Sequence, residues 1–484
     1  MPITLVRDLP ALAARPLDLL VVGGGIYGLT VACDAAQRGL SVALIEKGDF
    51  GSGTSFNHLR TIHGGLRYLQ TLDIPRARES VRERRALARI APWAIAPLPF
   101  VLPLTASLTR GSLAMRAGFM LDRLVAPDRN EGLGASHVLP GGTVLSADAA
   151  RAQYPELRDL PMAGAARWFD YVTVEADRLT LAWGLAAAQA GAALANYVEA
   201  TSLDLVDGRV RAVHATDGLT GTTFRIEARA VVLAAGGSIN TLLGPARAAV
   251  PLPLLQAVNL VTTLPAPAAA IGGRSASGRN LFLVPWRGRA LFGTWESPST
   301  CEPGALTISD AHLESFIAEL NQAFPSTPLQ RSDVSLVHRG VVPAKMRPDG
   351  PPTLDGGERV HDHSTTGVAN LISVAGTKYT TARSVAERIV DRVVSMQGRS
   401  AACRTATTPL PHVDASGDAL LRHAAQHEMV MTLADAVMRR TPLAVLGHPG
   451  RAALEHAADI VGDVLGWSPD RRAHEVDALA PVFP

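Results

Sequence analysis

A glycine-rich turn near the N-terminus constrains the fold of this chain more than any other feature. The segment 23–28 contains the pattern G-x-G-x-x-G. It follows the short apolar run 19–22, opens an alanine-rich stretch, and precedes a second apolar run at 41–45. Strand, tight turn, helix and strand in this order predict a complete βαβ unit of the dinucleotide-binding kind.

Each glycine of this turn has a separate task in such a unit. Gly23 permits the tight turn, Gly25 lets the backbone approach a pyrophosphate, and Gly28 allows the helix to pack closely on the strand. The backbone N–H groups at the start of the helix then face the phosphates. Glu46 ends the second strand, where its carboxylate can accept the ribose hydroxyls. We therefore predict a dinucleotide site over this segment.

The sequence after Glu46 favours FAD over a nicotinamide nucleotide. A loop rich in glycine, serine and threonine, 49–55, follows the acidic residue and could wrap a second phosphate or the ribityl chain. A second glycine turn, 235–237, ends a strand much later in the chain. Flavoproteins that interleave their cofactor and substrate segments have this arrangement, although an ordinary turn at 235–237 would look the same.

Composition excludes several classes of protein. Of 484 residues, 47% are hydrophobic and 19% are charged, and the formal net charge is +2, which argues against disorder and against a nucleic-acid reader. No uncharged apolar stretch is long enough to span a membrane, and charges at 7, 8, 15 and 18 break any signal-peptide core. Three scattered cysteines offer neither a disulfide framework nor a metal site. We expect a cytoplasmic globular enzyme.

Lysine is scarce in this chain. The 46 basic residues comprise 43 arginines and only three lysines, Lys47, Lys345 and Lys378. A lysine that persists against this background is a candidate for chemistry that requires an amine.

The remaining pattern alternates helices and strands up to a helical tail. Predicted helices cover 29–38, 76–90, 113–124, 179–190 and 309–324, and predicted strands include 192–197, 230–234, 259–264, 280–285 and 290–294. Segments 203–213 and 223–229 are predicted to pair as a hairpin, and the proline-rich segment 92–103 is predicted to be irregular.

Several blocks make the chain resemble a known family. Segment 63–69 reads HGGLRYL, which looks like the signature of the flavin-dependent glycerol-3-phosphate dehydrogenases. Further blocks agree in order along nearly the whole chain: DRL at 177–179, FLVPW at 282–286, GT at 293–294, GTKYTTAR at 376–383, EM at 428–429, RRT at 439–441 and GHPG at 447–450.

The resemblance implies an α/β architecture like that of D-amino-acid oxidase. A Rossmann-like FAD-binding domain (16–104, 163–250 and 336–398) would be interleaved with a mixed-sheet substrate or cap domain (105–162 and 251–335). An all-helical C-terminal domain would cover 403–484.

The resemblance also implies roles for individual residues. His63, Arg67 and Lys378 would be catalytic, with His63 as the base for a hydroxyl proton and the two cations holding a phosphate or polarising developing charge. Substrate would contact Arg67, Tyr68, Asn259, Arg339 and Lys378. FAD would contact Gly23, Gly25, Ile26, Tyr27, Gly28, Glu46, Lys47, Thr54, Ser55, His63, Gly64, Gly65, Val198, Ala235, Gly236, Gly376, Thr377 and Thr380. No metal is implied.

The chain departs from the family around the expected substrate. The family's G-V-R-P segment is G-V-V-P here, so Val342 stands where an arginine is expected at the substrate phosphate. Asn259 replaces a histidine of the family. Arg339 lies nearby in sequence, but residues three positions apart along a strand point to opposite faces.

These observations predict FAD-dependent oxidation of the secondary hydroxyl of a small phosphorylated polyol, glycerol 3-phosphate or a close relative, by hydride transfer to flavin. The alternatives are an amine or amino-acid oxidase of the same superfamily, oxidation of a non-phosphorylated polyol or hydroxy acid, and an inactive scaffold. Electrons would pass to a quinone or another acceptor. We expect a bacterial protein with peripheral contact to the inner face of the cell membrane. The sequence leaves open a homodimer, the natural acceptor, and whether FAD is covalently linked.

Overall fold

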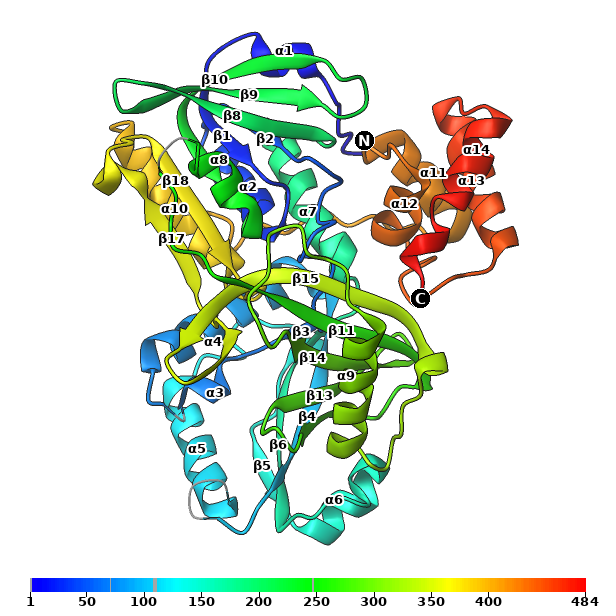
Figure 1. The fold of residues 1–484 in the computed structure, drawn as a ribbon. Helices are drawn as coiled ribbons and strands as arrows, with labels where there is room; N and C mark the ends of the chain where they lie inside the picture. The colour runs from blue at the N-terminus through cyan, green and yellow to red at the C-terminus, as the bar shows by residue number, and fades with distance from the viewer. Residues whose placement is uncertain (1, 70, 108–110, 246–247) are drawn as a thin grey trace.

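Two sheets and a helical C-terminal domain make up the molecule. The computed structural model describes residues 2–69, 71–107, 111–245 and 248–484. Figure 1 shows the first sheet in the upper part with the helices α2 and α7, the second sheet below it, and the C-terminal helices to one side. The predicted fold class is confirmed.

The first sheet contains the predicted βαβ unit. Strand β1 (Leu17–Val22) lies between β2 (Val42–Ile45) and β10 (Thr223–Leu233), parallel to both. Helix α2 (Ile26–Gln37) connects β1 to β2 and begins three residues earlier than predicted. The strand order is β17-β18-β10-β1-β2-β7, with β7 (Ala193–Ala195), β17 (Glu358–Asp362) and β18 (Leu371–Gly376).

The hairpin beside this sheet differs from the predicted one. The segment 203–213 is not a single strand, because the chain turns at Asp207 and Gly208, both with positive φ (51° and 70°). Strands β8 (Val198–Val206) and β9 (Arg209–Asp217) therefore form the hairpin. Strand β10 then pairs with β9 at its start and with β1 at its end, so it joins two segments that the sequence suggested were separate.

The second sheet has the order β16-β15-β11-β14-β13-β12-β4-β6-β3, with β5 beside β6. Its strands are β3 (Thr61–Ile62), β4 (Ile95–Leu104), β5 (Thr143–Leu145), β6 (Gly164–Thr173), β11 (Leu254–Pro265), β12 (Ala270–Arg274), β13 (Asn280–Trp286), β14 (Arg289–Glu296), β15 (Val334–Arg347) and β16 (Gly350–Leu354). Strands β3, β4, β6, β16 and most of β15 fall within the ranges predicted for the FAD-binding domain, and the structure places them in this sheet. Strand β15 pairs with β11, β4 pairs with β12, and β6 pairs with β4.

Strand β4 corrects the prediction of an irregular proline-rich crossing. It pairs with β6 without interruption from Ile95↔Thr173 to Leu104↔Gly164. Pro97, Pro99 and Pro103 are all at odd positions, so the missing N–H donors lie on one edge of the strand. The other edge keeps every donor that the ladder with β6 needs, which is why the strand persists.

Helices cover the sheets and form the tail. The helices before the tail are α1 (Leu9–Ala13), α3 (Leu66–Leu69), α4 (Ile74–Ile90), α5 (Ser112–Val125), α6 (Ala147–Gln153), α7 (Ala176–Gln189), α8 (Ile239–Leu243), α9 (Asp310–Ala323) and α10 (Ala382–Met396). Short 3₁₀ turns are η1 (Pro92–Ala94), η2 (Ala135–His137), η3 (Pro155–Leu157), η4 (Gly236–Ser238), η5 (Arg331–Asp333), η6 (His363–Thr366) and η8 (Ala480–Val482). Among the described residues, no helix is long and apolar enough to cross a membrane.

The C-terminal helices share a core with the second sheet. They are α11 (Gly417–His427), α12 (Leu433–Asp435), which continues into the π-helical turn η7 (Ala436–Arg440), α13 (Arg451–Leu465) and α14 (Pro469–Asp477). One apolar cluster contains Phe100 and Trp286 of the sheet together with Val437 and Val461 of the tail. The tail is therefore packed into the molecule and is not an appendage on a linker.

Candidate functional site

The glycines of the first turn have different surroundings. Gly23 has a φ of +109°, and a Cβ there would lie 2.6 Å from the Ala234 carbonyl oxygen of the neighbouring strand end. A Cβ at Gly28 would overlap the Gly23 carbonyl oxygen. A Cβ at Gly25 would meet only Ser55 Oγ, at 3.1 Å, among the described residues. The protein's own packing therefore requires the first and third glycines, whereas Gly25 leaves space at the N-terminus of α2.

A half-buried carboxylate lies beside this turn. Glu46 Oε2 accepts a hydrogen bond from the Gly24 N–H at 2.6 Å, and Oε1 accepts one from the Gly48 N–H at 2.8 Å. Burial raises the pKa of the Glu46 carboxyl, and the two N–H donors only partly oppose that rise. The Val198 N–H donates to the Glu46 carbonyl at 2.8 Å, so the predicted neighbours Glu46 and Val198 are together, while Lys47 is exposed.

The loop after β2 connects the turn to the second sheet. Ser55 Oγ accepts a hydrogen bond from the N–H of Ile26, the first residue of α2, at 2.9 Å. The neighbouring Thr54 hydroxyl donates to the Val341 carbonyl in β15, at 3.1 Å. Two adjacent side chains thus bind α2 and β15, and this holds the loop across the junction of the two sheets.

The block GTKYTTAR comes to the same place from the other end of the chain. The Tyr27 hydroxyl on α2 donates to the Lys378 carbonyl at 3.0 Å, and a Cβ at Gly376 would overlap the Tyr27 ring. Lys378 Nζ lies 4.2 Å from the centre of the Tyr68 ring, a cation–π contact. The Arg67 guanidinium lies 5.6 Å from the same ring. Arg67 and Tyr68, which are neighbours in sequence, therefore lie together with Lys378 from near the other end of the chain.

Other predicted residues lie around this group. Thr377 Oγ1 donates to the Asp355 carbonyl at 2.7 Å, and Thr380 is buried. Ala235 and Gly236 follow β10 beside Gly23, because the Ala234 N–H donates to the Val22 carbonyl at 2.7 Å.

His63 is half-exposed and has a partner on each ring nitrogen. Its Nδ1 lies 3.3 Å from Asp170 Oδ2, and its Nε2 lies 3.0 Å from Thr61 Oγ1. The ring packs edge-on against Phe100, with centroids 5.3 Å apart. The imidazole is therefore fixed on one side and reachable from solvent on the other, with 48% of the side chain exposed.

The two glycines after His63 allow close packing on α4. A Cβ at Gly64 would overlap the Arg84 guanidinium, which pairs with Asp170 directly behind the turn. Gly65 has a φ of +82°, and a Cβ there would lie 2.8 Å from the Ser80 Cβ. The HGG sequence is needed because α4 passes immediately behind it.

Sequence reasoning missed Asp170 and Arg84. Asp170 is in the middle of β6, with only 2% of the residue exposed. The only sequence signal is an acidic residue within the otherwise aromatic and apolar run 168–172. Arg84 lies among many charged residues of α4 and gives no separate signal.

The substrate-side residues of β11 and β15 divide between two faces of the sheet. Val342 pairs with Leu255, and Asn259 pairs with His338, on the face that Thr54 approaches at Gly340. Asn259 Nδ2 donates to the Asn57 carbonyl at 3.0 Å and its Oδ1 accepts from the Thr294 hydroxyl at 2.7 Å.

Arg339 lies on the opposite face. Its strand partner is Val258, which belongs to the apolar core beneath α9. Burial, and then Arg331, lower the pKa of Arg339. The Arg339 backbone N–H does contact the loop, donating to Asn57 Oδ1 at 2.9 Å. The guanidinium itself is not with Val342, so the structure does not place it as a replacement for the missing arginine.

The segment before β3 contains a buried arginine. Arg60 is fully buried, lies 4.5 Å from the centre of the Trp286 ring, and has Asp177 as its ion-pair partner. Burial, reinforced by the charge of Arg60, holds the pKa values of His58 and His338 well below their usual range. These two histidines are therefore neutral at physiological pH, and we interpret the cluster as support for the loop.

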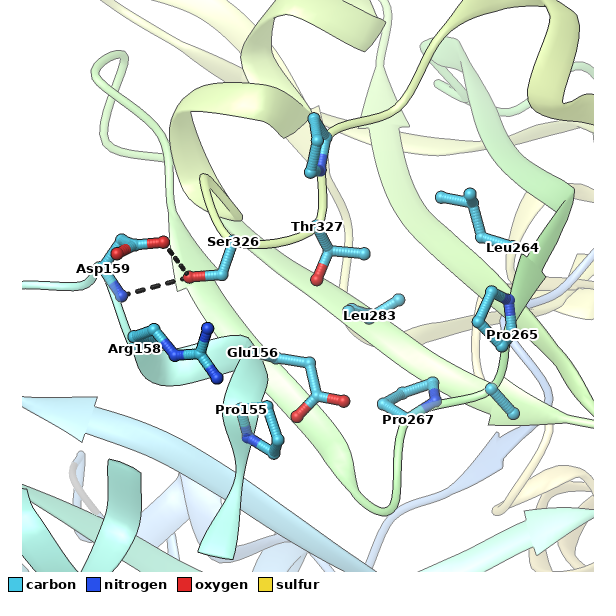
Figure 2. Close-up of a pocket in the computed structure, with 12 residues that line it drawn as sticks. Pro155, Glu156, Arg158, Asp159, Leu264, Pro265, Pro267, Leu283, Ser326 and Thr327 are labelled. Carbon is cyan, nitrogen blue, oxygen red and sulfur yellow. Dashed lines mark hydrogen bonds between the residues drawn. The ribbon is translucent and has the colours of Figure 1, made fainter. Parts of the chain in front are cut away.

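A separate groove of about 480 Å³ lies on the outside of the second sheet. Figure 2 shows Glu156 and Arg158 of the η3 region facing the turn that holds Pro265 and Pro267, and the Ser326 hydroxyl donating to Asp159. None of the predicted site residues lines this groove.

Comparison with known families and proteins gives a consistent result. The family model described as FAD dependent oxidoreductase matches residues 18–392, and the C-terminal domain of alpha-glycerophosphate oxidase matches 352–472. A glycerol-3-phosphate dehydrogenase of Synechocystis sp. is 31% identical over 96% of this chain and 96% of its own length. The mitochondrial glycerol-3-phosphate dehydrogenase of Macaca fascicularis is 34% identical over 78% of this chain, but the match spans about half (52%) of that protein.

The fold also matches a solved structure. A glycerol-3-phosphate dehydrogenase from Bacillus halodurans, complexed with FAD, superposes with a TM-score of 0.74 at 22% sequence identity. The match covers 98% of this chain and 95% of that one, so the tail is included in the shared fold.

Proposed function

The chain belongs to the FAD-dependent oxidoreductases, in the glycerol-3-phosphate dehydrogenase family, and from this premise we propose that it oxidises the secondary hydroxyl of glycerol 3-phosphate. FAD is the cofactor of the family, as the loop 49–55 after Glu46 favoured. The observation that carries the proposal is the meeting of HGGLRYL and GTKYTTAR at the Tyr68–Lys378 contact. Each of these two segments resembles the family on its own, and the fold places them in contact.

The residues of this chain fit FAD. The space at Gly25, where a side chain would stand in the way, adjoins the N-terminus of α2, and a helix N-terminus favours a pyrophosphate. The half-buried Glu46 carboxylate suits ribose hydroxyls, because they would supply further donors to a charge that its enclosure disfavours. When bound, FAD supplies the acceptor for the hydride that leaves the carbinol carbon.

The roles of the chain's own groups follow from their chemistry. His63 Nε2 takes the hydroxyl proton while the electron pair of the carbinol C–H bond leaves as hydride, so the alcohol becomes a ketone. Arg67 and Lys378 supply two positive charges beside Tyr68, where they attract the phosphate and oppose charge that develops on the oxygen. Their proximity to one ring supports a common task.

Anaerobic mixing of the purified holoprotein with each candidate substrate tests this activity. We expect glycerol 3-phosphate to bleach the flavin absorbance and to support turnover with a dye acceptor, whereas glycerol, a D-amino acid and an L-amino acid do not. Faster bleaching by an amino acid, together with no reaction of glycerol 3-phosphate, would reject the proposal in favour of an amine oxidase.

We also propose that the outer face of α5 contacts an anionic lipid surface. Leu113, Met120 and Leu124 are 76%, 66% and 78% exposed and recur at helical spacing, with Arg116 and Arg123 exposed beside them. Figure 1 shows α5 at an outer edge of the molecule. Exposed apolar side chains flanked by arginine suit the boundary between acyl chains and acidic headgroups. The location that fits is the inner face of the cell membrane, where a quinone acceptor would be reachable.

Co-sedimentation with vesicles tests this contact. We expect binding to vesicles that contain phosphatidylglycerol, weaker binding at high salt, and loss of binding in Leu124→Glu. The matched control is Leu219→Glu, which alters an exposed leucine in the β9–β10 turn. Equal loss in both variants, or none in either, would contradict the role of α5.

A further inference from the structure

Asp170 is a buried carboxylate with four donors around it, and two of them belong to the HGG segment. Its Oδ1 accepts the Gly64 N–H at 2.8 Å and pairs with Arg84. Its Oδ2 lies 3.3 Å from His63 Nδ1 and 3.3 Å from Trp168 Nε1. The carboxylate therefore holds both the backbone after His63 and the His63 ring.

Asp170 is ionised in this setting. Burial alone raises the pKa of its carboxyl, but the Arg84 guanidinium, followed by His63 and the Gly64 N–H, outweighs burial and lowers that pKa below its usual value. An ionised carboxylate only accepts hydrogen bonds. His63 must therefore carry a proton on Nδ1, and the neutral ring then presents the lone pair on Nε2.

The contacts of the other ring nitrogen, Nε2, are consistent with this tautomer. Thr61 Oγ1 lies 3.0 Å from Nε2, and its hydroxyl can donate to that nitrogen when the ring carries its proton on Nδ1. No carboxylate of the described residues pairs with Nε2. The ring is also held between Asp170 and Phe100, so its plane is set by contacts on two sides. A base needs both features, the correct tautomer and a fixed direction, before the substrate arrives.

We propose that Asp170 is a positioning residue that fixes His63 as the Nδ1–H tautomer and aims its Nε2 at the substrate hydroxyl. This inference rests on the proposed function, in which His63 takes the hydroxyl proton. Arg84 keeps the carboxylate charged, and Gly64 is required because a side chain there would displace Arg84. One buried pair thus connects α4, β6 and the HGG turn.

A double-mutant cycle with His63→Gln and Asp170→Asn tests the proposal. We expect His63→Gln to lower kcat by about 10²- to 10⁴-fold, and Asp170→Asn to lower kcat more than it changes KM. If Asp170 acts through His63, adding Asp170→Asn to His63→Gln causes no further loss. Equal losses from Asp170→Asn in the two backgrounds would overturn the proposal.

A spectroscopic measurement supplies a readout that does not depend on turnover. ¹⁵N-histidine NMR of the holoprotein, at a pH where His63 is neutral, reports which ring nitrogen carries the proton, and the His63→Gln spectrum assigns the signals. We expect Nδ1–H in the wild type and loss of that preference in Asp170→Asn. An Nε2–H ring in the wild type would overturn the proposal. If the protein proves inactive on glycerol 3-phosphate, the proposed function fails, but this measurement still decides the Asp170 contact.

Folding of the variant is controlled separately. Asp170→Asn leaves the Arg84 charge buried without its partner, which is destabilising. The double variant Arg84→Met/Asp170→Asn removes both charges, and we expect it to fold with the same altered tautomer. Asp128→Asn, which breaks the Arg78 ion pair elsewhere on α4, is the matched control and should leave the tautomer and kcat unchanged. A wild-type tautomer in the folded double variant would contradict the role of the carboxylate.

Discussion

At the scale of single residues, the three glycines of the first turn are not interchangeable. Gly23 and Gly28 are required by contacts within the protein, whereas Gly25 has an extended backbone (φ −75°, ψ −178°) that any residue can adopt. Substitution at Gly25 should therefore separate cofactor binding from folding.

We expect Gly25→Ala to weaken FAD binding by about ten- to hundredfold, because losing one or two hydrogen bonds to a charged group costs about 1.5–3 kcal/mol. The stability of the apoprotein should change by less than about 0.5 kcal/mol. Fluorescence titration with FAD and urea unfolding measure the two effects. Gly118→Ala, which adds a Cβ where no atom of the described residues lies within 4 Å, is the control. Unchanged FAD affinity in Gly25→Ala would show that the pyrophosphate lies elsewhere.

Val342 makes a second residue-scale prediction. It is buried in an apolar cluster with Leu255, Ala257 and Ala344 on the face that Thr54 approaches. An arginine there lacks a partner, so Val342→Arg should destabilise the protein by about 3–5 kcal/mol until an anion binds. We expect glycerol 3-phosphate to raise the Tm of Val342→Arg more than that of the wild type and its KM to fall by up to about a hundredfold.

The control for this prediction is Arg339→Ala, which removes a cation from the opposite face of the same strand. Its KM should equal that of the wild type. A large rise in KM in Arg339→Ala, with no effect of glycerol 3-phosphate on Val342→Arg, would mean that the backbone of β15 rearranges on binding.

Single residues also show why part of the site could not be predicted. The glycine turn, Glu46 and the HGG segment carry local patterns that can be interpreted without a fold. Asp170 has no such local pattern. Its contact with His63 depends on the pairing of β6 with β3, which places Tyr171 opposite Ile62 and therefore Asp170 beside His63. A contact between residues 107 positions apart requires the register of two strands.

At the scale of helices and strands, the π-helical turn η7 connects the tail to the loop after β2. Arg440 binds Asp49 through both of its terminal nitrogens at 2.7 Å, and Arg439 binds the same carboxylate. Burial raises the pKa of the Asp49 carboxyl, but the two guanidiniums more than reverse this and lower it far below its usual range. Nearby, Arg178 of α7 pairs with Glu428, at the end of α11. The loop that leads to Thr54 and Ser55 is therefore held by the tail.

Glu428 makes this connection dependent on pH. Burial raises the pKa of its carboxyl, but His423 and Arg178 outweigh burial and lower the pKa to about 2. A depressed pKa stabilises the fold above the unfolded value, and that stabilisation is lost as the pH falls through the folded value. We expect Glu428→Gln to be less stable than the wild type by about 3–5 kcal/mol at pH 7, and the difference to shrink between about pH 4.5 and 2.

Urea unfolding of both proteins at pH 7, 4.5 and 3 measures this difference. The exposed Glu455→Gln is the control and should match the wild type throughout. A stability difference that stays constant down to pH 3 would show that Glu428 contributes through packing and not through its charge.

Elements differ in how far sequence determines them. The helices were placed to within a few residues because their apolar periodicity is local. Strand β4 was missed because three prolines usually exclude a strand, and only the pairing of β4 with β6 shows that the lost donors fall on one edge. The turn at Asp207–Gly208 was missed because the residues around it continue the strand pattern.

At the scale of the whole molecule, the tail and the second sheet form one folding unit. Their common core includes Phe100 and Trp286 from the sheet and Leu454 from α13. The FAD-binding and cap domains expected from sequence are each discontinuous along the chain, and several strands within the ranges expected for the FAD-binding domain lie in the second sheet.

We therefore expect a chain that ends at residue 402 to aggregate and to lack FAD. Removal of the tail uncovers the apolar face of the second sheet and leaves Asp49 buried without its arginines. Size-exclusion chromatography and the absorbance of bound flavin test this, and co-expression of 403–484 as a separate fragment should restore both. A truncated chain that is monomeric and yellow would contradict the shared core.

The Lys378–Tyr68 contact gives the protein a built-in chemical reporter. Amine-selective acylating reagents spare guanidinium groups, so in a chain whose positive charge is almost entirely arginine they can modify only three side chains and the α-amino group. Lys47 and Lys345 are exposed, and Lys378 is half-buried over the Tyr68 ring. The rate at which the Lys378 peptide is acylated, normalised to the rates of the other two lysines, therefore reports whether a bound molecule covers the Tyr68 ring. The measurement needs no introduced dye or mutation.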